Sequence, residues 1–498
     1  MTWNEALPLL LLATSLVPAL VIFLLPERSE RPRRILNLVG AITKVALAGL
    51  LVVGVFRDIE YEWRGAFLPG IDLVLRVDAI PLLFVFLSAL LWLTTTVYAI
   101  GYLRHDEHHA RFFGFFSLCV TATVGIALAG NLVTFLIFYE LLTVTTYPLI
   151  VHRGHDRARS GGRTYLLYTV SGGAVLLVGI AWLHSVAGPV EFGDTATLAA
   201  LAETHRGSLI GIFVLLIAGL GVKAALVPLH GWLPQAMVAP APVSALLHAV
   251  AVVKAGVYGT VRVVYDLFGV ELAVDLGVLR PLMVVAAVTI VFGSLRALVQ
   301  QDLKRRLAYS TVSQLSYVVL GISMAGITGA TGGLVHLVHQ GVMKVTLFYC
   351  AGNLYEALGV SRVRDLDGAG RSLPLTMGAF TVAAIGMIGI PPTAGFISKW
   401  YLGLGGIEVG ELWILAVLAL SSLLNAAYFL PLIARAWFRP PPADRVEPAR
   451  EGRFELSGWL LLPPLATGAS ALVLGALAGV PLSPLSWAEF IAEEVFGR

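Results

Sequence analysis

The stretch GVKAALVPLHGW, residues 221–232, decides how the rest of this sequence is interpreted. It puts Lys223 and Pro228 into a segment that is otherwise apolar enough to be a membrane helix. A charged side chain at the centre of a bilayer costs several kcal/mol, so intramembrane lysines are rare and mark functional sites. The interpretation therefore depends on whether the surrounding sequence is a membrane domain, and on which other polar groups accompany the lysine.

The composition is that of an integral membrane protein. Of 498 residues, 57% are hydrophobic and 13% are charged, and the mean hydropathy is +0.84. Runs of roughly 18 to 25 apolar residues, each long enough to cross a bilayer, recur from end to end. The loops between them leave room for neither a nucleotide-binding domain nor a separate catalytic domain. We therefore treat residues 1–498 as a single transmembrane domain.

The apolar runs divide into about fourteen spans, and the loops test this division. Most of the arginine, 20 of 28 residues, falls in the loops after spans 1, 3, 5, 9, 11 and 13, whereas the intervening loops and the C-terminal AEFIAEEVFGR are acidic or nearly neutral. Cytoplasmic loops carry the excess of Lys and Arg. The sequence thus predicts an all-α polytopic protein of the inner (plasma) membrane with both termini outside the cytoplasm. The predicted spans are residues 6–25, 35–56, 78–102, 112–130, 132–151, 164–186, 208–227, 241–265, 281–299, 307–326, 330–355, 375–402, 412–434 and 456–480.

Two further features limit the chemistry. The first run, MTWNEALPLLLLATSLVPALVIFLL, has no basic leader and no small-residue cleavage site, so we expect a first helix and not a removed signal peptide. The two cysteines, Cys119 and Cys350, lie in separate apolar runs, which favours neither a disulfide framework nor iron–sulfur ligation. Any redox chemistry would belong to partner subunits, and we predict no cofactor or metal site in this chain.

Lysine and arginine are distributed differently along the chain. Five of the six lysines, all except Lys304, fall inside predicted spans, whereas the 28 arginines lie overwhelmingly in loops. A guanidinium stays protonated in any surroundings, but desolvation can neutralise a lysine. A lysine inside the membrane can therefore take up and release a proton.

An acidic group and two helix breaks accompany these lysines. Glu140 lies in LIFYELLTVTTYPLIVH, on a helix face that also carries hydroxyls. Pro228 should break or kink the helix just after Lys223 and leave carbonyls free near the charge. The pair Pro391–Pro392 should break a second helix some two turns before Lys399. Both predicted breaks are thus paired with a lysine.

Two other spans place several polar groups on one helix face. His248 follows the APAPVS break, and Lys254, Tyr258 and Arg262 then recur every four residues. In LVHLVHQGVMKVTLFYCAG, the residues that share a face are His336, His339, Gln340 and Lys344. Deeply placed ionisable groups in five separate helices are hard to explain by structure alone, given their cost. We interpret five of them as stations of a hydrophilic path: Glu140, Lys223, Lys254, Lys344 and Lys399.

Structural interpretations compete for some of these groups. A lone intramembrane histidine can be a hydrogen-bonded packing residue, and a lysine near a helix end can snorkel to the headgroups. Lys44 lies mid-span without polar neighbours on its own face, so a structural role and a transport role are equally open for it. The tract RHDEHHAR contains His105, His108 and His109 but lacks a partner motif for a metal, and we interpret it as a solvated loop.

Five segments together resemble the antiporter-like membrane subunits shared by respiratory complex I, Mrp-type cation/proton antiporters and membrane-bound hydrogenases. They extend over roughly residues 75 to 435 and read FYELLTVTTYPLI, VKAALVPLHGWLPQAMVAPAPVSALLHAVAVVKAGVYG, QDLKRRLAYSTVSQLSYVVLG, HLVHQGVMKVTLFYCAGN and GIPPTAGFISKW. The resemblance implies a bundle of about fourteen helices with two inverted five-helix repeats, residues 112–265 and 281–434, each containing a broken helix. The size, Lys399 and the MVAPAPVSALLHA block look closest to the Mrp D-type subunit or a hydrogenase-associated homologue.

The resemblance also implies roles for single residues. Glu140 and Lys223 would form the ion pair of the first half-channel, and Lys399 would be the terminal group near the outer half-channel. Opening the pair in a low-dielectric site could drive a proton along the chain. The groups that would link the two halves are His248, Lys254, His336, His339 and Lys344.

The leading interpretation is a non-redox, proton-translocating subunit of a multisubunit membrane complex, which exchanges H⁺ for Na⁺ or is driven by a redox partner. Its partners would be other membrane subunits and the lipid bilayer, with no nucleic acid. A standalone transporter of an organic solute is disfavoured, because a solute site concentrates polar groups at one midplane crevice. The energising subunit of an inorganic-carbon uptake complex stays an alternative. We find no sequence motif for an enzyme with its own active site.

Overall fold

Long apolar helices dominate the computed structural model, which describes residues 2–57, 59–443 and 454–497. Within these residues, eleven helical segments are long and apolar enough to cross a membrane. They are α1 (Trp3–Leu24), α2 (Glu30–Val55), α3 (Ala79–Tyr102), α4 (His109–Leu128), α5 (Leu132–Ile150), α6 (Asp156–Ala187), the run from α8 (Ala202–Ala224) to η2 (Ala236–Val238), the run from α10 (Ala241–Ala245) to η4 (Val263–Phe268), α13 (Leu279–Leu298), α19 (Trp413–Phe438) and α20 (Gly458–Ala476).

Three more crossings are made by polar or interrupted helices. They are α14 (Leu303–Ser323), α15 (Ile327–Leu358), and α17 (Pro374–Ile388) followed by α18 (Ala394–Glu408). Polar side chains are tolerated in α14 and α15 because both helices are almost entirely buried inside the protein. These three crossings correspond to the predicted spans 307–326, 330–355 and 375–402. The predicted all-α polytopic fold with about fourteen crossings is confirmed.

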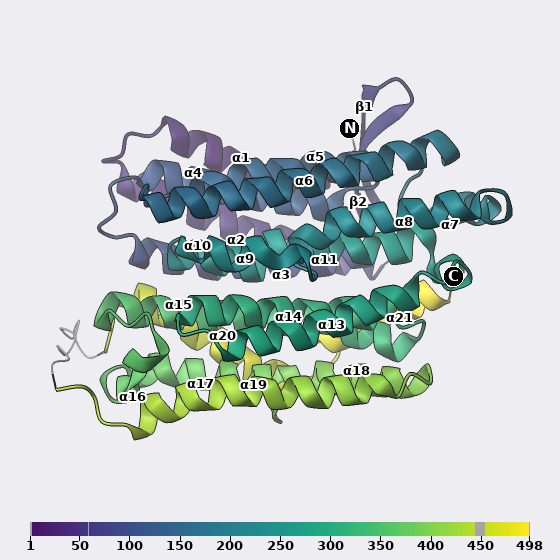
Figure 1. Cartoon of the computed structure of the whole chain (residues 1–498). Coiled ribbons are helices and arrows are strands. Elements are labelled where there is room, and N and C mark those ends of the chain that lie inside the picture. The colour runs from purple at the N-terminus through teal and green to yellow at the C-terminus, as the bar shows by residue number, and fades with distance from the viewer. Residues whose placement is uncertain (1, 58, 444–453, 498) are drawn as a thin grey trace.

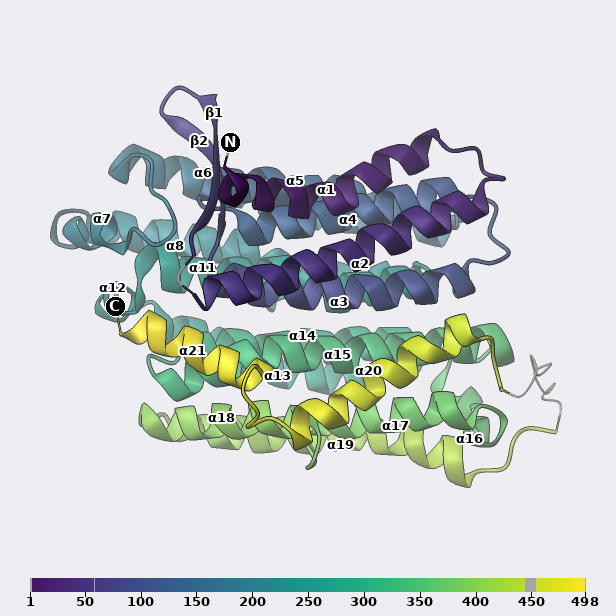
Figure 2. The ribbon, with the colours of Figure 1, turned by 180° about the vertical axis from the view of Figure 1, so that it is seen from behind.

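The helices form two groups that lie side by side. Figures 1 and 2 show α1–α6 and α8–α10 on one side and α13–α20 on the other. The groups meet where α11 (Val252–Arg262) packs on α14, and where α10 and η3 (Leu246–Val250) pack on α15. The repeat limits, residues 112–265 and 281–434, stay a prediction.

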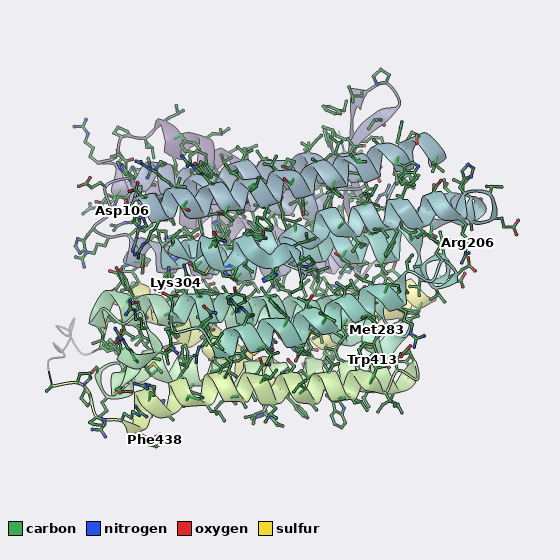
Figure 3. The ribbon with its side chains drawn as sticks, in the orientation of Figure 1. Asp106, Arg206, Met283, Lys304, Trp413 and Phe438 are labelled. Atoms are coloured by element: carbon green, nitrogen blue, oxygen red, sulfur yellow. The ribbon has the colours of Figure 1, made fainter. Side chains whose placement is uncertain are left out.

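The loops lie alternately at the two ends of the bundle. Figure 3 labels at one end Asp106, Lys304 and Phe438, and at the other end Arg206, Met283 and Trp413. The first end, here called the basic end, carries the arginine-rich loops, and the second, here called the acidic end, carries the others. Both chain termini lie at the acidic end (Figure 2). The order of the loops agrees with the alternation in the sequence.

Both predicted helix breaks are present. After α8 the chain turns at Ala225 (φ 58°) and passes through Pro228 into η1 (Leu229–Gly231), α9 (Trp232–Gln235) and η2. Residues 389–393, which include Pro391 and Pro392, separate α17 from α18. Proline cannot donate an N–H and clashes with the preceding turn, so the helix stops there.

A third irregularity was not predicted. The sequence predicts one helix over 241–265, but this crossing contains the π-helical segments η3 and η4, and its regular geometry is lost at Ala251 (φ −119°, ψ −87°). Single-turn π segments insert an extra residue into a helix and are frequent at functional sites. His248 lies inside η3, shortly before the irregular residue.

A β-hairpin at the acidic end was also not predicted. Its strands are β1 (Tyr61–Leu68) and β2 (Ile71–Val77), joined at Gly70 (φ 78°). Arg76 donates to Glu62 (2.7 Å) and to Glu191 (2.6 Å), which fastens the hairpin to the connection after α6.

The last crossing consists of two helices. The sequence predicts a single span over 456–480, whereas α20 ends at Ala476 and α21 (Pro484–Phe496) continues to the acidic end (Figure 2). The remaining short helices lie in connections and are α7 (Thr195–Ala200), α12 (Val270–Asp275), η5 (Val363–Leu366) and α16 (Ala369–Ser372).

Candidate functional site: a series of buried lysines

Lys223 reaches α5 but does not pair with Glu140. It lies in the last turn of α8 and is fully buried. Its Nζ donates to the carbonyl of Tyr139 and lies 3.3 Å from the centroid of the Tyr139 ring. Glu140 is half-buried, and its Oε1 has no hydrogen-bond partner in the described part of the chain. Among the described residues no ion pair within 4.0 Å joins Glu140 and Lys223, so the pair is open in this structure.

The Val222 carbonyl beside the break after α8 is occupied. It accepts hydrogen bonds from the Ala225 N–H at 3.2 Å and from the Trp232 indole at 2.7 Å. The Lys223 ammonium is held by the Tyr139 carbonyl instead. On the facing helix α6, a Cβ added at Gly173 would lie 2.6 Å from Cδ of Glu140, so this glycine makes the room for the carboxyl group.

Lys254 connects the two groups of helices. It is fully buried in α11, and its Nζ donates to the carbonyl of Leu337 in α15 at 2.6 Å. His248 stacks on Phe348 of the same helix α15, with ring centroids 4.6 Å apart. Neither ring nitrogen of His248 has a hydrogen-bond partner in the described structure. The two predicted linking groups of the crossing from α10 to η4 thus both contact α15.

Lys254, Tyr258 and Arg262 share one face of α11, and the last of them belongs to a separate cluster of ion pairs. The Tyr258 hydroxyl donates to the carbonyl of Ala127 at 2.7 Å. Arg262 is fully buried and lies 2.9 Å from Asp266 and 3.3 Å from Asp78. These contacts join α11, η4 and the start of α3 near the acidic end. Arg262 therefore shares a helix face with Lys254 but is held by carboxylates, not by the lysines.

Lys344 starts a chain of hydrogen bonds into α19. Its Nζ donates to Ser310 Oγ (2.7 Å) and to the carbonyl of Leu307 (3.2 Å) on α14. The Tyr428 hydroxyl contacts Ser310 Oγ at 2.8 Å and also contacts Asn425 Oδ1. A phenol has one proton to donate, so Ser310 can donate to Tyr428 while Tyr428 donates to Asn425.

Lys399 closes this chain at the second break. Its Nζ donates to the carbonyls of Met387 (3.0 Å) and Ile388 (2.8 Å) and to Ser422 Oγ (3.1 Å). The two carbonyls belong to the last turn of α17, which the break leaves without intrahelical partners. Asn425 Nδ2 donates to the same Met387 carbonyl at 3.3 Å. Lys344 and Lys399 are therefore connected by an unbroken series of hydrogen bonds.

The two histidines of α15 lie in different surroundings. His336 Nδ1 is 2.7 Å from Ser398 Oγ, and Ser398 directly precedes Lys399. His339 is buried, and neither of its ring nitrogens has a hydrogen-bond partner within the described residues. His336 thus approaches the terminal lysine, whereas His339 lies apart from the bonded chain.

Sequence reasoning missed the neutral members of this chain. It concentrated on ionisable groups and passed over Ser310, Tyr428, Asn425, Ser398 and Ser422. A signal was present, because Ser421, Asn425 and Tyr428 recur at helical spacing in a span that is otherwise apolar.

Two other groups singled out in the sequence lie elsewhere. Lys44 is fully buried and donates to the Leu11 carbonyl (3.0 Å) and to Ser15 Oγ (2.9 Å), so its partners come from α1 and not from its own helix. In the loop RHDEHHAR, a hydrogen bond from His152 at 3.0 Å lowers the pKa of Asp106 to about 2. Within the described residues no group of three His, Cys, Asp or Glu side chains could hold a metal ion.

These features define a class of protein: a polytopic membrane protein with buried lysines and neutral polar groups in both halves of its helical bundle. Comparison with known proteins identifies the family. A family model described as "NADH:quinone oxidoreductase/Mrp antiporter, TM" matches residues 129–425, and one described as "NADH-Ubiquinone oxidoreductase (complex I), chain 5 N-terminus" matches residues 69–113. The chain belongs to the NADH:quinone oxidoreductase/Mrp antiporter family of membrane subunits.

Relatives come from both branches of that family. The chain is 38% identical over 443 residues to NADH-quinone oxidoreductase subunit N of Desulforudis audaxviator, covering 86% of this chain and 87% of that protein. It is 33% identical over 382 residues to the A/B subunit of a "Probable K(+)/H(+) antiporter" of Rhizobium meliloti, covering 75% of this chain but only 38% of that longer protein.

Solved structures agree with the fold. The Mrp complex from Dietzia sp. DQ12-45-1b contains a chain that matches with a TM-score of 0.87 at 25% identity, covering 100% of this chain and 98% of that chain. A chain of the archaeal membrane-bound sulfane sulfur reductase has the same fold, with a TM-score of 0.86 at 24% identity and coverage of 98% and 99%. Both neighbours are components of multisubunit membrane complexes.

Proposed function

We propose that this chain moves protons through the membrane part of a multisubunit complex. The residues proposed to carry the protons are Glu140, Lys223, His248, Lys254, His336, His339, Lys344 and Lys399. The observation that carries the proposal is the unbroken series of hydrogen bonds between Lys344 and Lys399.

The partners of the lysines support a transfer role. Lys254, Lys344 and Lys399 make no ion pair within 4.0 Å in the described part of the chain, and their ammonium groups are held by carbonyl and hydroxyl oxygens. An ammonium in a low-dielectric interior is stabilised less by such neutral groups than by a carboxylate. Each lysine is thus able to give up its proton when a neighbouring station becomes charged.

The hydroxyl groups connect the charge states of the two lysines. When Lys344 gives up its proton to another station, the Ser310 hydroxyl no longer accepts from an ammonium and can turn its own O–H, which changes its hydrogen bond with Tyr428. Asn425 does not carry a proton, but its amide reorients with the Tyr428 hydroxyl and alters the hydrogen bonding of the carbonyl that it shares with Lys399. Hydrogen bonds in series polarise one another, so the charge on one lysine influences the other.

The open Glu140–Lys223 pair, which joins α5 and α8, can act as a switch for proton movement in the first group of helices. In the open state Lys223 is bound to the Tyr139 carbonyl. Movement of its ammonium to Glu140 would close the pair and withdraw positive charge from the path toward Lys254. Opening and closing of this pair is the step that we propose to be coupled to the partner subunits.

The driving reaction and the location are further parts of the proposal. One relative is named as a probable K⁺/H⁺ antiporter subunit and another as an NADH-quinone oxidoreductase subunit, which supports either antiport of H⁺ against a cation or proton pumping driven by a redox partner. The cation that we propose is Na⁺ or K⁺. We place the protein in the inner (plasma) membrane with its basic end in the cytoplasm and both termini outside, because basic loops are retained on the cytoplasmic side.

The test uses inverted membrane vesicles from cells that carry the whole gene cluster. One set contains Lys223→Ala, and a matched set contains Lys44→Ala, which removes an equally buried lysine whose hydrogen bonds to described residues go to α1. If Na⁺ or K⁺ collapses a pH gradient only when Lys223 is intact, the chain belongs to an antiporter. If a redox substrate builds a gradient that needs Lys223, it belongs to a redox-driven pump. Equal proton movement in both assembled variants and in the wild type would refute the proposal.

A further inference from the structure

A cavity opens at the basic end where the two groups of helices meet. Its volume is about 270 Å³. The end of α3, the α5–α6 connection, η2, the start of α14 and the end of α15 line it. It lies at the same end of the bundle as Lys304, which Figure 3 labels, and is separate from the buried lysines of the proposed proton path.

Three cationic side chains line this cavity without forming an ion pair within 4.0 Å to a described residue. They are Arg153, Arg157 and Lys304. Arg153 contacts the Tyr102 hydroxyl at 3.4 Å and lies over the ring of Tyr355 at 5.5 Å. Glu356 of α15 attracts Arg153 from beyond ion-pair distance, so it leaves the guanidinium free to bind another anion.

The surroundings of Lys304 indicate a positive potential. Its Nζ donates to the Ala239 carbonyl at 2.6 Å, and the Arg153 guanidinium is close enough to repel its charge. Asp302 also lines the cavity and attracts the Lys304 ammonium, and its Oδ1 accepts the N–H of Arg305 as the cap of α14. The positive charges around the cavity therefore outnumber the negative ones.

Two helix N-termini add to this potential. Both α6 and α14 begin at the cavity, since Arg157 and Lys304 lie in their first turns. The N-terminus of a long helix carries roughly half a positive charge and favours a bound anion. Apolar side chains complete the wall, and they include Met237, Val238 and Leu303.

We propose that this cavity binds a phosphate group, supplied either by the headgroup of an anionic phospholipid or by free inorganic phosphate. Arginine suits phosphate because its planar fork can donate two parallel hydrogen bonds. Basic pockets between helices at a membrane surface bind anionic headgroups, with apolar walls next to the acyl chains. The site takes Arg153 and Arg157 from one group of helices and Lys304 from the other, so the bound phosphate holds the two groups together.

Direct binding to the purified full chain in dodecyl maltoside tests this inference. One arm measures retention of radiolabelled phosphatidylglycerol against phosphatidylcholine, and the other measures radiolabelled inorganic phosphate by equilibrium dialysis. The proteins are the wild type, Arg157→Gln and the double variant Arg153→Gln/Lys304→Gln. The matched control is Arg163→Gln, which removes an exposed arginine of α6 that does not line the cavity.

We expect binding to weaken about fivefold in Arg157→Gln and about thirtyfold in the double variant, with no change in the control. Loss of phosphatidylglycerol binding alone would identify a lipid headgroup as the source, and loss of inorganic phosphate binding alone would identify a free anion. Arg157 is exposed, so its variant tests the site even if the double variant does not fold. Absence of binding in both arms, or equal binding by all four proteins, would overturn the proposal.

Discussion

Replacing Tyr428 by phenylalanine would interrupt the hydrogen-bonded connection between Lys344 and Lys399 without removing a charge. The substitution keeps the buried ring and deletes only the hydroxyl, which contacts Ser310 Oγ at 2.8 Å and also contacts Asn425 Oδ1. No other residue bridges these two side chains among the described hydrogen bonds. We therefore expect Tyr428→Phe to slow proton transport.

The magnitude follows from the hydrogen bonds that are lost. Without the phenol, Asn425 Oδ1 is buried and unsatisfied, which costs about 1–3 kcal/mol of folding free energy. If about 1–2 kcal/mol of this loss falls on the proton-transfer step, the rate decreases about 5- to 30-fold. Stability and transport should thus both decrease, by amounts that can be measured separately.

The assay is the initial rate of pH-gradient change in inverted vesicles, divided by the amount of assembled protein. Thermal unfolding of the purified protein measures the stability part. Tyr98→Phe is the matched control, because its hydroxyl is equally buried and donates to the Tyr349 carbonyl at 3.0 Å, outside the lysine series. Both variants lose one buried phenol, but only Tyr428→Phe should slow transport per molecule.

Equal transport rates per assembled molecule in the two variants would refute this reasoning. The Ser310–Tyr428–Asn425 connection would then be structural. Lys399 would then be coupled to the rest of the path through His336 and Ser398, whose Oγ lies 2.7 Å from the imidazole.

Three other substitutions give independent predictions. Gly173→Ala should slow transport severalfold in the vesicle assay. The added Cβ would lie 2.6 Å from Cδ of Glu140, whereas an ordinary van der Waals contact is at least 3.4 Å, so the carboxyl group would have to move. An unchanged rate would show that the position of this carboxyl group is not critical. Arg262→Gln should lower the free energy of unfolding by about 3–5 kcal/mol, since it removes the cation that lies 2.9 Å from the buried carboxylate of Asp266, and an unchanged denaturation midpoint would contradict this. Asp106→Asn should destabilise the protein at pH 7, because the hydrogen bond from His152 lowers the pKa of Asp106 to about 2. A depressed carboxyl pKa stabilises the fold above about pH 4, so the difference in melting temperature should shrink as the pH falls from about 4 toward 2.

The crossings and the positions of the charges could be predicted from the sequence because they depend on local properties. Each span must satisfy its backbone hydrogen bonds within itself in a bilayer, so a run of apolar residues is sufficient to define it. The breaks at Pro228 and Pro391–Pro392 follow from the covalent structure of proline in the same way. The cost of burying Lys223 or Lys399 is likewise a property of the single residue and its span.

The irregular segments depended on packing and could not be predicted in this way. The π-helical turn at His248 lies in a sequence of ordinary helix-forming residues, and it occurs where η3 packs on α3 and α15. The hairpin of β1 and β2 is short, and Arg76 anchors it to Glu191, 115 residues further along the chain.

For this protein, the amino-acid order alone was enough to establish the membrane class, the alternation of the loops and the identity of the buried lysines. The partners of those lysines came from the folded structure. Lys223 binds a carbonyl 84 residues away, and Lys254 binds one 83 residues away. Hydropathy and charge can be read along a single span, whereas a hydrogen bond between two helices depends on their relative position and rotation, and the packing of the whole bundle determines both.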